Sequence, residues 1–164
     1  MKTILVMLVL GAAAYYFYGH LQSRREDAAP QEITNPVYLE VNIETSVQGR
    51  QLEFVLFGKM ADQDDCQNRA DRAWGKVIEG CANCQKKISS CQPTLEPRYL
   101  RLFDDAPINT TYLSFTRGQQ GERDGRMVFW GVTAAEGNAV CEAAKTEFSK
   151  NYKGAVSCVI GQAQ

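Results

Sequence analysis

Six cysteines are the residues of this 164-residue chain best suited to covalent chemistry. An even number favours a set of disulfides in an oxidising compartment outside the cytoplasm. The order of the cysteines favours two pairs, Cys66–Cys91 and Cys141–Cys158, each joining the start of a predicted helix to the segment that follows it. In the entropic model each of the two loops constrains the unfolded chain by about 3 kcal/mol.

The remaining two cysteines, Cys81 and Cys84, form a C-x-x-C motif. This spacing can hold a reactive thiolate and exchange disulfides. In exchange proteins the motif begins a helix, whose dipole stabilises the thiolate, whereas here it follows a predicted helix and meets the dipole's opposite end. We therefore expect a closed, inert disulfide, and thiol–disulfide exchange by this pair is the alternative function.

A zinc site is a third role for the same region. Cys81, Cys84 and Cys91, with Cys66 as a fourth ligand, would supply enough thiolates for tetrahedral coordination. The spacing to Cys66 is irregular, however, and the chain has no second C-x-x-C motif. The sequence therefore predicts no metal and no cofactor.

The sequence gives little support for other kinds of catalytic site. The single histidine, His20, lies beside an apolar N-terminal segment, which excludes a Ser-His-Asp or Cys-His arrangement inside the domain. Residues 118–121 lack the lysine and the helix of a phosphate-binding loop. The adjacent acids Asp104 and Asp105 are expected only to be solvated in a loop, because nothing places a second carboxylate opposite them. We expect a protein that is not an enzyme.

The composition of the chain argues against some classes of protein and of binding partner. The chain carries 18 Lys+Arg against 19 Asp+Glu, with a sequence pI near 5.9, so it lacks the positive charge that binds a nucleic-acid backbone. Charged residues at 23% and hydrophobic residues at 45% argue against disorder and against a multi-pass membrane protein.

The N-terminus predicts a membrane anchor. The apolar stretch at residues 3–21 would reach roughly 28 Å as a helix, just enough to span a bilayer. An aromatic cluster near its end suits the membrane–water interface. It comprises Tyr15, Tyr16, Phe17 and Tyr18. We assign residues 1–27 to a signal-anchor segment that contacts the lipid of the inner (plasma) membrane.

A cleaved signal peptide is the alternative to the anchor. Residues 12–14 offer a small-residue cleavage site, but cleavage there would leave a signal shorter than the usual range and would secrete the domain to the periplasm. The basic residues flanking the segment do not fix its orientation. The cysteines do, because they favour a domain that faces the periplasm.

The rest of the chain divides into a linker and one domain. Residues 28–36 contain two prolines and are predicted to form a short extended linker. Residues 37–164 are predicted to form an extracytoplasmic, disulfide-braced domain of a size that can bury a single core.

The first half of this domain begins with a predicted β-hairpin. Leu39, Val41 and Ile43 alternate with polar residues, as in a half-buried strand, and residues 52–57 form a second strand after a turn. A helix follows three acids, Asp62, Asp64 and Asp65, which suit its N-terminus better than a metal site. Its apolar stripe runs through Cys66, Ala70, Ala73, Trp74, Val77, Ile78 and Cys81.

The second half repeats this plan. After a cysteine-rich stretch and a third strand predicted at residues 98–103, the sequence favours strands at 111–116 and 126–130 with a glycine-rich loop between them. A helix is expected from about Asn138, with Cys141 in its first turn, followed by a last strand that contains Cys158. The matching order is consistent with an internal ββαβ duplication.

The sequence therefore predicts an α+β protein with an antiparallel sheet of about six strands, two helices packed on one face, and one N-terminal transmembrane helix. Trp74 and Trp130 are expected to pack in the core rather than to mark a partner surface. An anchor, a short linker and a compact domain without a catalytic set are typical of a membrane-anchored binding or assembly domain. Its partner would be another protein, as for a component of an envelope complex or for an inhibitor or immunity-like protein.

Overall fold

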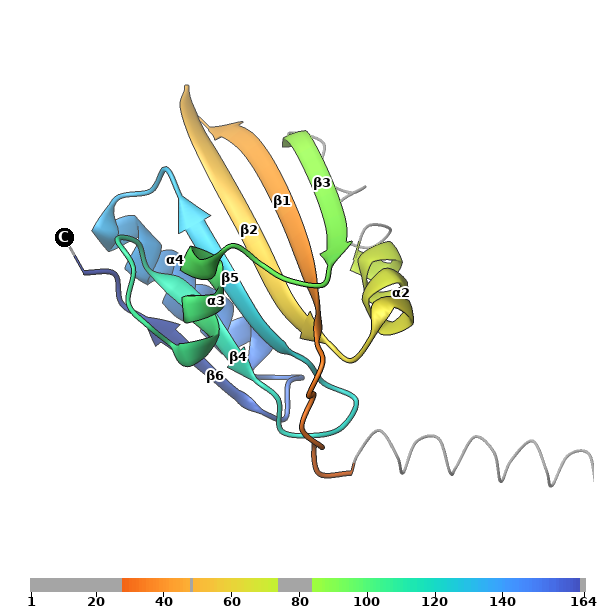
Figure 1. The fold of residues 1–164 in the computed structure, drawn as a ribbon. Coiled ribbons are helices and arrows are strands. Elements are labelled where there is room, and N and C mark those ends of the chain that lie inside the picture. The colour runs from red at the N-terminus through yellow and green to blue at the C-terminus, as the bar shows by residue number, and fades with distance from the viewer. Residues whose placement is uncertain (1–27, 48, 74–83, 163–164) are drawn as a thin grey trace, which may run out of the picture.

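A computed structural model describes residues 28–47, 49–73 and 84–162 of the chain (Figure 1). It has an α+β fold in which one antiparallel sheet has the strand order β3-β1-β2-β5-β4-β6. The strands are β1 (Val37–Val47), β2 (Arg50–Met60), β3 (Cys84–Gln92), β4 (Tyr112–Thr116), β5 (Asp124–Trp130) and β6 (Ala155–Val159). The helices are α2 (Gln63–Ala73), α3 (Pro97–Leu100), the 3₁₀ helix η2 (Arg101–Asp104) and α4 (Ala134–Phe148).

The two halves of the chain have the same connectivity. Each contains two strands, a helix and a third strand, β1-β2-α2-β3 and β4-β5-α4-β6, and the two sets meet where β2 pairs with β5. Each half also carries a disulfide from its helix to its last strand, Cys66–Cys91 and Cys141–Cys158. The sheet order is therefore symmetric about the border between β2 and β5.

The predicted N-terminal hairpin is present and longer than expected. β1 and β2 pair from Val37 and Met60 at one end to Val47 and Arg50 at the other. Side chains alternate between the two faces because successive residues of a strand point to opposite sides. On β2, Leu56 packs with the cluster beneath α2, and its neighbours in sequence pack on the opposite face of the sheet.

Both long helices lie on one face of the sheet, as predicted. Cys66 and Ala70 of α2 are buried against Leu39 and Val41 of β1, and α2 also contacts β3. Cys141 of α4 is buried against β4, and α4 contacts β4 and β6. The third helix, α3, packs with η2 on the other face, so the sheet is covered on both sides.

The third strand was predicted in the wrong place. Residues 98–103 form α3 and η2 instead, because Pro97 occupies the first turn and disfavours an extended sheet position. The true third strand, β3, lies in the cysteine-rich stretch, where polar residues at the sheet edge give no alternating pattern.

The second helix begins earlier than expected. Thr133 accepts a hydrogen bond from the backbone N–H of Glu136, and the Glu136 carboxylate accepts one from the backbone N–H of Thr133. This capping box starts α4 at Ala134. Cys141 therefore lies in the middle of the helix and not in its first turn.

The predicted anchor at residues 1–27, with its aromatic cluster, lies outside the described residues. Within the part that the structure describes, no helix is long and apolar enough to cross a membrane. The first strand, β1, begins at Val37. The two disulfides indicate an oxidising compartment outside the cytoplasm.

Candidate binding groove

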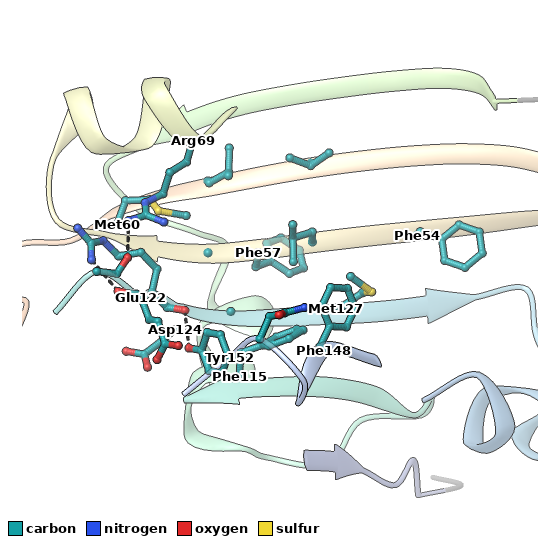
Figure 2. Close-up of a pocket in the computed structure, with 18 of the residues that line it drawn as sticks. Phe54, Phe57, Met60, Arg69, Phe115, Glu122, Asp124, Met127, Phe148 and Tyr152 are labelled. Carbon is teal, nitrogen blue, oxygen red and sulfur yellow. Dashed lines mark hydrogen bonds between the residues drawn. The ribbon is translucent and has the colours of Figure 1, made fainter. Parts of the chain in front are cut away.

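A groove with a volume of about 650 Å³ lies on the helix-bearing face of the sheet. It runs between α2 and α4 over β1, β2 and β5, where the two halves of the fold meet. Figure 2 shows its labelled lining residues, with Phe54 toward one end and Arg69, Met60 and Glu122 at the other. The volume of the groove falls within the range of small-molecule binding pockets.

The groove floor is apolar and adaptable. Ile43, Phe54, Leu56 and Met127 line it and are only partly buried, although their side chains point to the same face as the core. Leu56 and Met127 are register partners across β2 and β5. The flexible, polarizable methionine side chain can adjust its shape to an apolar ligand.

Two glycines are register partners two residues beyond Leu56 and Met127 on the groove floor. Gly58 on β2 pairs with Gly125 on β5. A Cβ atom placed on Gly58 would come within 2.3 Å of the Cε methyl of Met60, so that flexible side chain lies across the space that the glycine leaves. A Cβ on Gly125 would approach Phe115 at an ordinary contact distance of 3.5 Å.

Aromatic side chains line the groove on the side where α4 ends. The ring of Phe115 packs edge-on against Phe148 and against Tyr152, with centroid distances of 5.2 and 5.6 Å. Phe148 keeps 41% of its surface exposed and borders the groove. Phe148 therefore extends the apolar lining of the groove to the surface of the domain.

A cluster of charged side chains lies at one end of the groove. The Asp65 carboxylate accepts hydrogen bonds from Arg69 Nε at 2.8 Å and from Arg123 Nε at 2.5 Å. Arg69 also donates to the Gly121 carbonyl, which ties α2 to the β4–β5 loop. Burial by itself raises the pKa of Asp65, but the hydrogen bonds from Arg123, from the Ala61 backbone and from Arg69 outweigh burial and lower it to about 2.

Two further carboxylates at this end of the groove also accept hydrogen bonds from the protein backbone. The Glu122 carboxylate accepts hydrogen bonds from the backbone N–H groups of Gly118, Lys153 and Gly154. Asp124 accepts one from the backbone N–H of Arg117. Among the charged lining residues, Arg69 and Arg123 balance Glu122 and Asp124. The groove is therefore close to neutral, and its charges are committed to structural contacts.

The linker contacts the same end. The backbone N–H of Gln120 donates to the Ala28 carbonyl at 2.7 Å, and the Gln120 side-chain carbonyl accepts from the backbone N–H of Gln31 at 2.8 Å. Arg117 donates to the Gln31 carbonyl. The flanking residues Gln119 and Gly121 line the groove. Ala28, the first described residue, therefore lies beside this end.

The opposite face of the sheet contains a buried arginine. The Arg126 side chain is 3% exposed and donates hydrogen bonds to the carbonyls of Leu102, Phe103, Phe115 and Gly125. These bonds hold η2 on the sheet, and an ion pair of 3.0 Å links the guanidinium to Asp105.

Asp105 was therefore misread as an acid with only a solvated role. Besides pairing with Arg126, it accepts a hydrogen bond from the Ser114 hydroxyl at 2.7 Å. The sequence carried no signal for this, because strand and loop residues distant in the chain meet only in the folded sheet.

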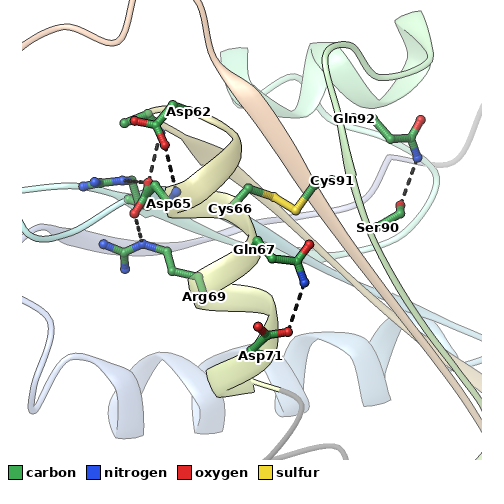
Figure 3. Close-up of a disulfide and its surroundings, with 11 residues drawn as sticks. Asp62, Asp65, Cys66, Gln67, Arg69, Asp71, Ser90, Cys91 and Gln92 are labelled. Carbon is green, nitrogen blue, oxygen red and sulfur yellow. Dashed lines mark hydrogen bonds and ion pairs between the residues drawn. A yellow bond between two sulfur atoms is a disulfide. The ribbon is translucent and has the colours of Figure 1, made fainter.

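The cysteines form structural links. Cys66 and Cys91 are disulfide-bonded (Figure 3), as are Cys141 and Cys158, which are the two pairings that the sequence favoured. Cys84, the first residue of β3, is also in a disulfide. Cys81 lies outside the described residues, so the C-x-x-C prediction stays a prediction.

Other predicted sites have local structural roles. Asp62 accepts a hydrogen bond from the backbone N–H of Asp65 and caps α2, as expected. Trp130 is partly buried against the core, as expected, whereas Trp74 lies outside the described residues. Within the described ranges, no group of three His, Cys, Asp or Glu residues could hold a metal ion.

Sequence reasoning missed the groove. In the sequence, the floor residues look like ordinary core residues. Alternation along a strand predicts which face of the sheet is buried, but it does not predict which helix, if any, covers a given part of that face. Only the placement of α2 over β1 and β3, and of α4 over β4 and β6, leaves the centre of this face open. No protein-family model, no curated protein and no solved structure matches this chain.

Proposed function

We propose that this protein is a non-enzymatic binding domain, tethered to the inner membrane and facing the periplasm, that receives a protein partner in the groove between α2 and α4. The observation that carries the proposal is the groove itself. It is a largely apolar cleft between the parts of this face that pack beneath α2 and α4. The N-terminal segment would provide the tether and the contact with membrane lipid.

The chemistry around the groove supports binding rather than catalysis. Asp65 is held ionised by two arginines, and Glu122 is bound by three backbone N–H groups. Burial raises the pKa of Tyr152, so its hydroxyl stays protonated at neutral pH. These groups are poorly placed to exchange protons with a substrate, whereas the apolar floor can bury a partner's side chains.

Groove blocking tests the proposal in the full-length protein in its native membrane. Met127→Trp adds an indole to the groove floor, and we expect it to leave the fold intact while at least tenfold less partner is recovered on affinity purification. The matched control is Ile88→Trp, since Ile88 is 46% exposed on the opposite face of the sheet. Equal recovery from the two variants would rule out the groove as the binding surface.

The tether has its own test. We expect the native protein to fractionate with the inner membrane and its intact mass to begin at Met1. A mass that begins at Tyr15, with recovery in the soluble fraction, would replace the tethered protein by a secreted one. That outcome would leave the groove proposal standing.

A further inference from the structure

The groove has the width of one helix. α2 packs mainly over β1 and β3, with slighter contact to β2, and α4 packs over β4 and β6, so the groove lies over the middle of this face between them. Strands are about 4.8 Å apart, so the three strands of the floor span about 10 Å. That width is close to the diameter of an α-helix with its side chains, about 10–12 Å.

The groove also has the length of a short helix. Along β2 its floor extends from Phe54 to Met60. Six residue steps at about 3.3 Å give roughly 20 Å. A helix with a rise of 1.5 Å per residue would cover that distance with about 13 residues, or between three and four turns.

The floor favours an occupant whose backbone is already hydrogen-bonded. β2 is paired on both sides, with β1 and β5, and β5 is paired with β2 and β4. The floor therefore offers no free strand edge to an extended peptide. An extended peptide would bury unpaired backbone groups against apolar side chains, whereas a helix satisfies these groups internally.

The position of Ala28 indicates the direction from which a helix would reach the groove. Twenty-seven residues precede Ala28, which is hydrogen-bonded to Gln120 beside the charged end of the groove. If these residues anchor the chain, this end of the groove lies nearest the bilayer. A partner helix that rises from the membrane next to the anchor would first lie beside the charged side chains at this end and then continue along the neutral apolar floor.

We propose that the groove between α2 and α4 is the docking site for a helix of about 13 residues from a membrane-protein partner, whose uncharged apolar face would contact the floor and complete the helical layer on this face of the sheet. The inference rests on the proposed function, because it identifies the partner's binding element. The methionines at positions 60 and 127 suit this role, since their side chains can adapt to the surface of a helix.

Photo-crosslinking in the full-length protein in its native membrane tests this proposal. The photoreactive residue p-benzoylphenylalanine replaces Phe54, Leu56 or Met127, one at a time, and the linked partner peptides are mapped. Leu56 and Met127 are register partners and should link to the same or adjacent partner residues. Phe54 and Leu56 are about 6.6 Å apart along the strand, so their links should fall about four residues apart in a helix.

Each other outcome overturns the helix assignment. Links about two residues apart would show an extended peptide, and adducts with an acyl chain would show a lipid site. Links to this same chain or to a second copy of it would replace the partner by an intramolecular or self-association contact, and no adduct at any of the three positions would leave the groove without an occupant. The photoreactive residue in place of Ile88 is the control and should give none of the groove adducts.

The two proposals can fail separately. If Met127→Trp removes the partner while the crosslinks indicate a strand or a lipid, the binding groove stands and the helix does not. If Met127→Trp and Ile88→Trp recover equal amounts of partner, the proposed function itself is wrong.

Discussion

The Asp65 carboxylate on α2 accepts a hydrogen bond of 2.5 Å from Arg123 in the β4–β5 loop, and so connects the helix of the first half to a loop of the second. Both side chains are largely buried, with 16% and 14% exposed. The pair lies at one end of the groove, so the two halves meet here through charge and along the floor through apolar contacts.

We predict that Asp65→Asn lowers the free energy of unfolding by about 1–2 kcal/mol at pH 7, since the amide loses the charge that two arginines bind. Urea unfolding measures the change. Asp64→Asn is the matched control, because Asp64 is an exposed acid in the same helical turn, and it should change stability by less than about 0.5 kcal/mol.

The effect of Asp65 should depend on pH. Its pKa is lowered from 3.8 to about 2 in the folded protein, so its stabilisation is fully present above about pH 4 and is lost as the pH falls toward 2. The difference between the parent and Asp65→Asn should therefore shrink over that range in urea unfolding experiments. A difference that stays constant down to pH 2 would show that the carboxylate charge is not the cause.

Replacing Arg126 with methionine should destabilise the domain by about 3–5 kcal/mol, since the carbonyls that bind its guanidinium and the Asp105 carboxylate lose their partner. Calorimetry or urea unfolding measures this. Arg98→Gln serves as the control, because Arg98 is 69% exposed and its ion pair with Glu96 should contribute less than about 1 kcal/mol. Equal effects would contradict the structural role assigned to Arg126.

Gly131 and Gly49 provide a matched test of steric crowding. Both have left-handed backbones, with φ of 78° and 79°, so alanine should cost about 1 kcal/mol of strain at either position. A Cβ at Gly131 would lie 2.2 Å from the Gln51 carbonyl oxygen, whereas one at Gly49 meets nothing within 4 Å. We expect Gly131→Ala to lower the unfolding free energy by about 1–3 kcal/mol more than Gly49→Ala. Equal losses in thermal or urea unfolding would place the crowding elsewhere.

Loss of the second disulfide should strongly destabilise the domain. Cys141→Ser or Cys158→Ser opens a link across 17 residues and should lower the unfolding free energy by about 2–5 kcal/mol. Urea midpoints and the yield of folded protein report the loss. A midpoint equal to that of the parent would show that the bond does not form in the native protein.

Cys84→Ser tests the alternative of disulfide exchange. Because Cys84 is already in a disulfide at the start of an edge strand, we expect its loss to lower stability modestly and to yield no mixed disulfides with other proteins. Non-reducing gels of the full-length variant decide this. Client-sized adducts that disappear with reductant would establish exchange chemistry and overturn the non-enzymatic proposal.

Much of the fold could be predicted from short-range patterns. Alternation at Leu39, Val41 and Ile43 identified β1 and its inner face, and cysteine order favoured the two disulfides that the structure contains. Such features are local or depend on pairing between elements that are adjacent in sequence, so the residue pattern is sufficient.

The errors have equally specific causes. β3 is a polar edge strand whose position depends on pairing with β1, so its residues lack the alternating pattern of a half-buried strand. Residues 98–103 look like a strand by composition, but Pro97 and the bonds from Arg126 to Leu102 and Phe103 hold them in helical turns. The early start of α4 did have a sequence signal, the capping box of Thr133 and Glu136.

The sequence by itself determined the α+β class, the N-terminal hairpin, the shared face of the two helices and the pairing of Cys66 with Cys91 and of Cys141 with Cys158, because these follow from periodicity and from cysteine order. Only the tertiary structure decided that Asp65 meets Arg123, that Asp105 meets Arg126 and that the centre of the helical face is open. The reason is physical. These relationships join segments tens of residues apart, and they depend on how far apart α2 and α4 sit on a six-stranded sheet, a distance that no local pattern of residues encodes.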